Sequence, residues 1–249
     1  MKQAIVNGRW QMWLPDSIAD WDAITGDYAA RRGWEFHRFE SLKSTLRPDD
    51  ILYEVGAEHG WISAVISREM CPNMVLFEPS PEMWTNIRKT WRYNGLEAPM
   101  GCWPGFVSDV STPQVAVAEG WPECALERGP DVGAMPYRSL QHHAEAIPSI
   151  TLDHYASLSG ITPTAINIDI EGAELRALQG ARALLTHPAS RLRVVWVSVH
   201  PDLMAGYNHT SDMLMDYMAN LGWWGWHLDT DHEEHWVFTR TPLPEGVPA

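Results

Sequence analysis

The stretch from Asp50 to Gly60 constrains the fold most strongly, because it joins an apolar run to two glycines and then to a helical pattern. The run 51–53 predicts a buried strand, and the apolar residues of 61–66 recur at helical spacing. Gly56 permits a backbone bend that a side chain would block, and Gly60 lets the chain pass close to a ligand or to the next helix. A strand, a glycine turn and a helix are typical of the first unit of an open α/β sheet, which binds ligands at the carboxyl ends of its strands.

The spacing of the glycines argues against two common nucleotide-binding motifs. Glu54, Gly56 and Gly60 form the pattern Glu-x-Gly-x-x-x-Gly, which differs from the Gly-x-Gly-x-x-Gly of dinucleotide sites. A Gly-Lys-Ser/Thr sequence does not follow, which disfavours a phosphate cradle. Taken alone, the motif also fits a purely structural turn, so the case for a ligand depends on the rest of the chain.

Composition narrows the functional classes. The 249 residues fit one α/β domain with extensions, and a hydrophobic content of 45% is enough for a sizeable core. The formal net charge of −14 and the pI of about 5.1 disfavour broad attraction to nucleic acid or to an anionic membrane. Three scattered cysteines predict reduced thiols in a cytoplasmic protein. We expect neither a signal peptide nor a membrane span, since no apolar run approaches the ~18 residues that a span needs.

An acidic residue ends the second predicted strand. Residues 74–77 form its apolar run, and Glu78 follows roughly 20 residues past the glycine turn, where a nucleotide-binding sheet holds a ribose diol. A carboxylate can accept the protons of both ribose hydroxyls. The alternative is a helix-terminal acid, since a helix is predicted over 81–93 and Ser80 could cap it. The two roles are compatible, and we expect Glu78 to bind the ribose.

The third predicted strand covers residues 103–107 and ends at Ser108 and Asp109. A carboxylate at this position could accept a hydrogen bond from the exocyclic amine of an adenine. A simple strand-end turn is an equally good interpretation. The following residues 112–148 are rich in proline and glycine and have a poor apolar pattern, which predicts a loop-rich insertion that could form a lid or a substrate wall.

Three acidic residues mark a second strand-to-helix junction. Apolar and polar residues alternate over 166–170, and Asp169, Glu171 and Glu174 crowd the end of this predicted strand. Crowding like charges is costly. The positive end of the following helix would account for Glu171 and Glu174, but it does not account for Asp169, which belongs to the strand. We therefore predict functional roles for Asp169 and Glu171.

The strand predicted over 194–199 ends at His200. At the same edge as Gly56, Glu78 and Asp169, this histidine could take a proton from a substrate. Hydrogen bonding into a loop is the alternative role.

The C-terminal part predicts an antiparallel pair of strands, 223–228 and 236–239, joined by a connection over 229–235. The two histidines of that connection do not have the four-residue spacing of a zinc helix, so the connection is predicted to be a solvated acidic turn. His142 and His143 of the insertion are likewise predicted to be a solvated pair.

The order of these elements resembles the seven-stranded fold of the S-adenosylmethionine (SAM)-dependent methyltransferases. Within that fold, the chain is similar to the FkbM-type methyltransferase family over the segments 54–60, 77–80, 94–95, 108–109, 151–153, 168–174 and 199–201. The Ile-Asp-x-Glu-Gly-x-Glu pattern is the most specific of these. The chain departs from the family at Glu54, Asn167 and Ser198, where the family usually has Asp, Lys and Glu. Losing the last two charges together suggests an altered acceptor site.

The resemblance implies an α/β fold with a Rossmann-like, seven-stranded, mostly parallel sheet, an antiparallel C-terminal hairpin and helices on both faces. Residues 48–249 would form the methyltransferase domain, and residues 1–47 an N-terminal extension packed on it. The implied reaction is methyl transfer from SAM, most commonly O-methylation of a hydroxyl on a sugar, glycan or natural product. The partner would be a small-molecule or glycan acceptor rather than nucleic acid or a membrane.

The resemblance also assigns roles to residues. Those expected to bind the cofactor are Glu54, Gly56, Ala57, Gly60, Glu78, Pro79, Ser108 and Asp109, and the catalytic candidates are Asp169, Glu171 and His200. Transfer is an in-line displacement, so alignment of the reacting atoms supplies much of the rate, and a hydroxyl nucleophile needs a proton acceptor. A metal is not part of this interpretation, although the acidic cluster could instead hold a divalent cation that binds the acceptor oxygens.

Two other functional classes stay open. Asn167 and Ser198 motivate a non-catalytic cofactor-binding or scaffold protein on the same fold. A nicotinamide-dependent oxidoreductase is the other, and the glycine spacing counts against it.

Overall fold

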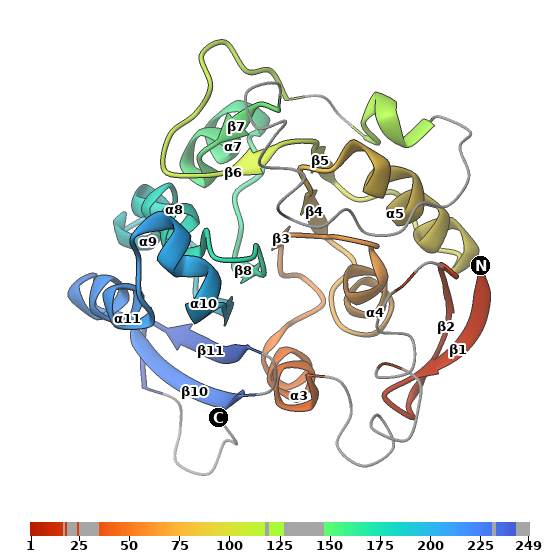
Figure 1. Cartoon of the computed structure of the whole chain (residues 1–249), viewed down its shortest axis with the longest axis horizontal. Helices are drawn as coiled ribbons and strands as arrows, with labels where there is room; N and C mark the ends of the chain where they lie inside the picture. The colour runs from red at the N-terminus through yellow and green to blue at the C-terminus, as the bar shows by residue number, and fades with distance from the viewer. Residues whose placement is uncertain are drawn as a thin grey trace.

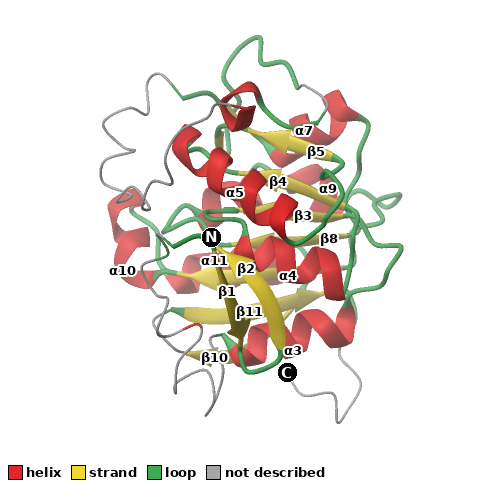
Figure 2. Cartoon of the chain, turned by 90° about the vertical axis from the view of Figure 1, so that its right-hand side faces the viewer, coloured by secondary structure: helices red, strands yellow, loops and turns green. Residues whose placement is uncertain are grey.

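A seven-stranded sheet runs through the middle of the molecule (Figure 1 and Figure 2). The computed structural model describes residues 1–16, 18, 24, 35–117, 120–126, 147–230 and 233–242. The strands of the sheet are β3 (Leu52–Val55), β4 (Met74–Phe77), β5 (Gly101–Trp103), β8 (Ala165–Ile168), β9 (Val194–Val199), β10 (Trp224–Thr230) and β11 (Glu234–Thr239). Their order across the sheet is β10-β11-β9-β8-β3-β4-β5. The first five in sequence pair in parallel, and β11 is antiparallel to both β9 and β10, which confirms the predicted Rossmann-like α/β class.

Strands β3, β4, β8 and β9 are buried at every residue. Their near-continuous apolar runs are typical of parallel strands covered on both faces. The chain order reverses between β3 and β8, since β4 and β5 lie on one side of β3 whereas β8 and β9 lie on the other. A topological switch point of this kind opens a crevice at the carboxyl ends of the two strands.

Helices cover both faces of the sheet. They are α3 (Phe36–Thr45), α4 (Trp61–Glu69), α5 (Pro81–Tyr93), α7 (Leu152–Ser159), α8 (Glu174–Gln179), α9 (Arg182–Thr186), α10 (Pro201–Met204) and α11 (Ser211–Asn220), with short 3₁₀ turns η1 (Glu123–Leu126) and η2 (Ala205–Tyr207). One apolar core cluster joins the sheet to α3, α4 and α5, and a second joins it to α7, α8, α9 and α11.

Helix α5 illustrates how the sequence pattern sets the packing. Met83, Ile87 and Trp91 recur at helical spacing and are all buried within the helix predicted over 81–93. Pro81 opens the helix, where its missing N–H costs nothing. Ser80 occupies the N-cap position, but its hydroxyl donates to the Glu82 carboxylate instead of accepting from the helix, so the expected side-chain cap is not formed.

The N-terminal residues form a hairpin and a helix. Strands β1 (Lys2–Val6) and β2 (Trp10–Leu14) pair antiparallel, and β2 packs on α4 and α5. Helix α3 lies beside the C-terminal hairpin of β10 and β11 (Figure 1).

The prediction of the third strand was partly wrong. The strand that joins the main sheet is β5, whereas β6 (Phe106–Val107) leaves it after Gly105 and pairs with β7 (Ser149–Ile150) in a separate two-stranded sheet. Most of the expected insertion, with His142 and His143, lies outside the described residues. Among the described helices, none is both long enough and apolar enough to cross a membrane.

Candidate functional site

The glycine turn and the acidic cluster meet at the switch point. The Asp169 N–H donates to the carbonyl of Val55 at 2.9 Å. Gly56 has φ of 95°, and a Cβ built on it would lie 1.8 Å from the carbonyl oxygen of Asp169. A side chain at this position would therefore force the ends of β3 and β8 apart. The equivalent Cβ on Gly60 would lie 2.8 Å from the Cα of Ile87, so Gly60 serves helix packing.

Glu78 lies beside the turn, at the end of β4. Its Oε2 accepts a hydrogen bond from the Glu58 N–H at 2.9 Å, and its Oε1 accepts from the Ser80 N–H at 2.8 Å. Burial raises the pKa of Glu78 to about 7, although both backbone donors favour the ionised form. Each carboxylate oxygen has two lone pairs, so each can accept one more hydrogen bond.

The backbone of the turn is tied to the strand that carries Glu78. The N–H groups of Gly56 and Ala57 both donate to the carbonyl of Phe77, at 2.9 and 3.0 Å. These two amides are therefore engaged within the protein. Pro79 follows Glu78 as a half-buried residue in the loop that leads to α5.

Glu54 is a buried residue of β3 that belongs to the acidic cluster. It is buried in the middle of the sheet, and both of its carboxylate oxygens accept from the Asn167 side-chain amide, at 3.0 and 2.9 Å. Burial raises the pKa of Glu54 to about 7, against the lowering effects of Arg38 and Asn167. Asn167 thus uses its amide to satisfy a neighbouring acid.

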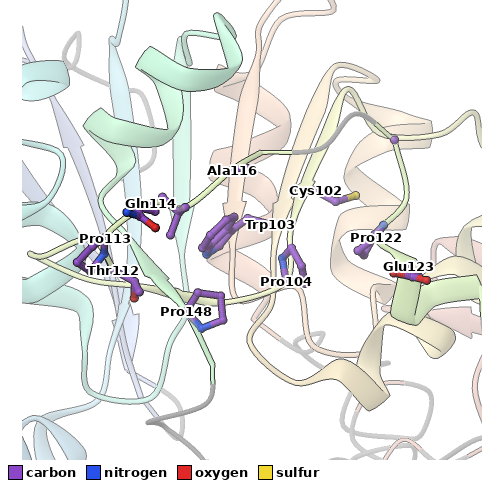
Figure 3. Close-up of a pocket in the computed structure, with 12 residues that line it drawn as sticks. Cys102, Trp103, Pro104, Thr112, Pro113, Gln114, Ala116, Pro122, Glu123 and Pro148 are labelled. Carbon is purple, nitrogen blue, oxygen red and sulfur yellow. The ribbon is translucent and has the colours of Figure 1, made fainter.

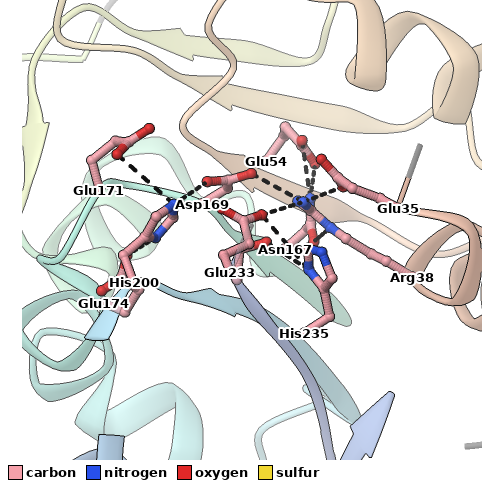
Figure 4. Close-up of polar contacts among 11 residues, drawn as sticks. Glu35, Arg38, Glu54, Asn167, Asp169, Glu171, Glu174, His200, Glu233 and His235 are labelled. Carbon is pink, nitrogen blue, oxygen red and sulfur yellow. Dashed lines mark hydrogen bonds and ion pairs between the residues drawn. The ribbon is translucent and has the colours of Figure 1, made fainter. Parts of the chain in front are cut away.

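Sequence reasoning missed Arg38. This side chain comes from α3, is 1% exposed, and reaches the acidic cluster (Figure 4). Its Nη1 donates to Glu35 at 2.6 Å and to Asp169 at 3.0 Å, and its Nε donates to the Oδ1 of Asn167 at 3.3 Å. Burial lowers the pKa of Arg38, but the surrounding carboxylates, Glu35 first, outweigh burial and raise it. A weak signal existed, since Arg38 is one turn before the buried Leu42 on the same helix face.

His200 is held between carboxylates as a cation. Its Nδ1 lies 2.9 Å from Glu174 Oε1, and its Nε2 lies 2.5 Å from Glu233 Oε2. Burial lowers the pKa of His200, but these two carboxylates outweigh burial and raise it to about 11. Both ring nitrogens therefore carry protons near neutral pH, and in this state the imidazole has no lone pair with which to take a proton.

The predicted solvated turn before the last strand is wrong for Glu233 and His235. They are 3% and 1% exposed, and the Nδ1 of His235 lies 3.2 Å from the Ser198 hydroxyl. The cause is register: β11 runs antiparallel to β9 with His235 opposite Ser198, so the start of β11 lies at the carboxyl edge of the sheet. Local sequence could not show this pairing. Residues 231–232 lie outside the described part of the connection.

Asp169 and Glu171 differ in how they meet solvent. Burial raises the pKa of Asp169, but the charge of Arg38 and then that of His200 outweigh burial and hold it below its ordinary value. The Glu171 side chain is 51% exposed, and its Oε2 lies 3.9 Å from the His200 Nε2. Burial of its inner part raises the pKa of Glu171, against the lowering effect of His200. The structure thus brings together the three catalytic candidates.

Asp109 faces a different neighbour from the one expected. Its Oδ1 accepts from the Arg176 Nε at 2.7 Å and from the Ser108 hydroxyl at 2.9 Å. Burial raises the pKa of Asp109, but these hydrogen bonds outweigh it and lower the pKa. The carboxylate is therefore already engaged by α8, and its contact with an adenine would compete with this ion pair.

A cavity of about 350 Å³ lies beside β5 (Figure 3). It is lined by Cys102, Trp103, Pro104, Thr112, Pro113, Gln114, Val115, Ala116, Gly120, Pro122, Glu123 and Pro148. Trp103, which lines the cavity, accepts a hydrogen bond on its carbonyl from the Glu78 N–H at 3.1 Å. The cavity therefore lies next to the end of the strand that carries Glu78. Its mainly apolar lining and its size are typical of a small-molecule pocket.

Two sets of side chains among the described residues have the composition of a metal site. Asp169, His200 and Glu233 form one, Glu35, Glu233 and His235 form the other, and the ligand atoms in each set lie within 4.8 Å of one another. In the first set the proton on the His200 Nε2 balances the carboxylates, and a metal ion would have to displace it.

Comparisons with known proteins concern the fold. No protein-family model matches the chain, and no curated protein sequence matches it. Among solved structures, the methyltransferase FkbM from Methylobacillus flagellatus is 16% identical with a TM-score of 0.48, over 82% of this chain and 50% of that one. A methyltransferase from Pyrococcus furiosus is 12% identical with a TM-score of 0.43, over 82% of this chain and 81% of that one.

A third similar structure is TrmK from M. capricolum, solved with S-adenosyl-homocysteine. It is 6% identical with a TM-score of 0.42, over 84% of this chain and 70% of that one. Similarity at this level is similarity of fold. The chain spans half the length of the Methylobacillus protein.

Proposed function

We propose that the protein is a SAM-dependent methyltransferase that methylates a hydroxyl of a small-molecule or glycan acceptor. One observation carries the proposal. Val55 is in register with both Phe77 and Ile168, so the residues that follow these three strands lie at one edge of the sheet, at the switch point. A nucleoside-bearing ligand binds at this position in doubly wound sheets.

The residues at this edge fit the parts of SAM. Glu78 retains the lone pairs that two ribose hydroxyls need, and it is buried beside the turn. The cavity next to Trp103 offers an apolar slot for the adenine, and we assign the adenine there in preference to a contact with Asp109. The acidic cluster supplies negative charge for the sulfonium. When bound, SAM supplies an electrophilic methyl group.

The site also has a place for the proton that the acceptor hydroxyl loses. His200 is already protonated, which leaves the carboxylates. Glu171 has a raised pKa and an exposed side chain, and a base whose pKa approaches the working pH is the more effective one. We assign Glu171 as the proton acceptor and Asp169 as the ionised neighbour that orients the hydroxyl. With SAM bound, the acceptor oxygen would gain the methyl group as the carbon–sulfur bond of the sulfonium breaks, leaving S-adenosylhomocysteine, and the hydroxyl proton would go to Glu171.

The test is binding of the product S-adenosylhomocysteine, followed by calorimetry. We expect the purified protein to bind it, and Glu78→Ala to weaken binding by about 100-fold or more, because two hydrogen bonds to a charged group are lost, each worth about 1.5 kcal/mol or more. Glu97→Ala is the matched control, since Glu97 is an exposed glutamate in the turn after α5. The proposal fails if the wild type does not bind, or if the control weakens binding as much as Glu78→Ala.

A second measurement separates an enzyme from a binding protein. Asp169→Asn should keep the affinity for S-adenosylhomocysteine and lose turnover in a screen of hydroxylated acceptors. Equal loss of affinity and turnover would move Asp169 from the acceptor side to the cofactor side. Binding without methylation of any acceptor in a broad screen would favour the scaffold alternative.

A further inference from the structure

We propose that Arg38 is a positioning residue for this site: from helix α3 it holds the Asp169 carboxylate at the switch point and compensates the charge of the acidic cluster. This inference rests on the proposed function, because it concerns the same site. It makes helix α3, a part of the N-terminal segment, a component of the catalytic apparatus.

Arg38 holds the side chain of Asp169, whereas the central strands hold only its main chain. Backbone pairing with Val55 holds the main chain of Asp169, whereas the Arg38 Nη1 donates to its Oδ2 at 3.0 Å. The same guanidinium reaches Asn167 through Nε at 3.3 Å. Arg38 therefore braces two positions of the β8 end at once (Figure 4). A rigid guanidinium fork is suited to holding several oxygens in a fixed geometry.

The charges around Asp169 come from several elements. The positive groups that face it are Arg38 from α3, His200 after β9, and His235 from β11 when protonated. The carboxylates of the cluster are Glu35 before α3, Glu54 in β3, Glu171 and Glu174 after β8, and Glu233 before β11. Salt bridges from the Arg38 Nη1 reach Glu35, Asp169 and Glu233, at 2.6, 3.0 and 4.0 Å. Arg38 is thus a cation that Glu35, Asp169 and Glu233 share, although these three carboxylates come from different elements.

Electrostatics give the consequence a direction. Burial favours the protonated form of Asp169, and the charge of Arg38 is the largest of the cationic effects that oppose burial. Loss of Arg38 should therefore move the titration of Asp169 to higher pH, toward a neutral acid that no longer orients an acceptor hydroxyl. A side chain that served only to fill space would not have this effect.

The chain contains a matched control at the opposite edge of the sheet. Arg193 precedes β9 and binds Asp50, which precedes β3, with Nε 3.1 Å from Asp50 Oδ1. The pKa of Asp50 is also lowered, with burial raising it and the hydrogen bond from Arg193 opposing burial. Arg193→Met therefore removes an arginine from a comparable ion pair that takes no part in the proposed site.

The experiment follows Asp169 by ¹³C NMR of side-chain-labelled aspartate over a pH titration, with the resonance assigned by its loss in Asp169→Asn. We expect the Asp169 midpoint to move to higher pH in Arg38→Met and to stay in place in Arg193→Met. Because Arg38→Met leaves buried acids uncompensated and could fail to fold, the double variant Glu35→Gln/Arg38→Gln, which removes one charge of each sign, is titrated in the same way.

An unchanged Asp169 midpoint in whichever of these Arg38 variants is folded would overturn the inference. The measurement needs neither cofactor nor acceptor. A wild type that fails to bind S-adenosylhomocysteine while the midpoint moves as expected would therefore refute the proposed function and leave the role of Arg38 standing.

Discussion

The affinity for S-adenosylhomocysteine should depend on pH through Glu78. In the proposed site a ribose diol would donate to the ionised carboxylate, and the pKa of this carboxyl is raised to about 7 by burial. At pH 6, one unit below that value, about a tenth of the molecules carry the ionised form, so affinity should fall about tenfold, or ~1.4 kcal/mol, relative to the plateau above pH 8.

The effect on the stability of the free protein has the opposite sign. The folded-state pKa of Glu78 lies above its ordinary value of 4.5, so the folded protein binds this proton more tightly than the unfolded chain does. The stabilisation is fully present below pH 4.5 and is lost as the pH rises through about 7. Ligand binding should therefore improve over the same interval in which the free protein loses stability.

Calorimetric titrations from pH 5.5 to 8.5 measure this dependence, and Glu78→Gln should flatten it. Glu54 has a similarly raised pKa, but its carboxylate is buried and accepts hydrogen bonds from the Asn167 amide. Glu54→Gln is therefore the control, and it should leave the pH dependence of the affinity in place. A wild-type affinity that does not change with pH, or a slope that disappears in Glu54→Gln and persists in Glu78→Gln, would refute the assignment of the ribose to Glu78.

Two further predictions concern the turn and the base. Gly56→Ala should abolish binding of S-adenosylhomocysteine and lower the melting temperature markedly, because the added Cβ would lie only 1.8 Å from the Asp169 carbonyl oxygen. Gly95→Ala is the control, since Gly95 has φ of 68° and nothing lies within 4 Å of its added Cβ. It should cost only the backbone strain of about 1–2 kcal/mol. Glu171→Gln should leave the affinity for S-adenosylhomocysteine and the melting temperature nearly unchanged, since the side chain is half exposed. It should lower turnover about 10²- to 10⁴-fold once an acceptor is known. A variant with undiminished turnover would remove Glu171 from the mechanism.

The sequence predicted the sheet well because its signals are local. Apolar runs ending in Glu54-x-Gly56, in Glu78 and in Asp169 identified three parallel strands and the residues at their tips, and the fully buried strands confirm that pattern. Strand β5 was less well defined, since a three-residue strand followed by Pro104 and Gly105 looks continuous with the next apolar pair.

The acidic cluster around Asp169 was only partly predictable, because some of its side chains are brought to it by long-range packing. No sequence pattern singled out Arg38, and Glu233 and His235 were predicted to be solvated turn residues. Their burial follows from where α3 and β11 dock, which depends on strand order and register rather than on any short pattern. Asn167 and Ser198 were noted as departures from a family pattern, and the structure shows that both are hydrogen-bonded within this cluster.

The docking of α3 against the β10–β11 hairpin has a consequence for the timing of folding. The glycine turn and Glu78 belong to β3 and β4, which are close neighbours in sequence, whereas Arg38 meets Asp169 and Glu233 only when distant parts of the chain have closed on each other. Contacts of such high sequence separation are slow to form, because the chain between the two partners has to close before the contact stabilises it. In a partly folded chain we therefore expect the glycine turn and Glu78 to be in place before Arg38 meets Asp169. If the proposed function is right, a proteolytic cut near α3 or β11 should reduce methyl transfer more than it reduces binding of the cofactor.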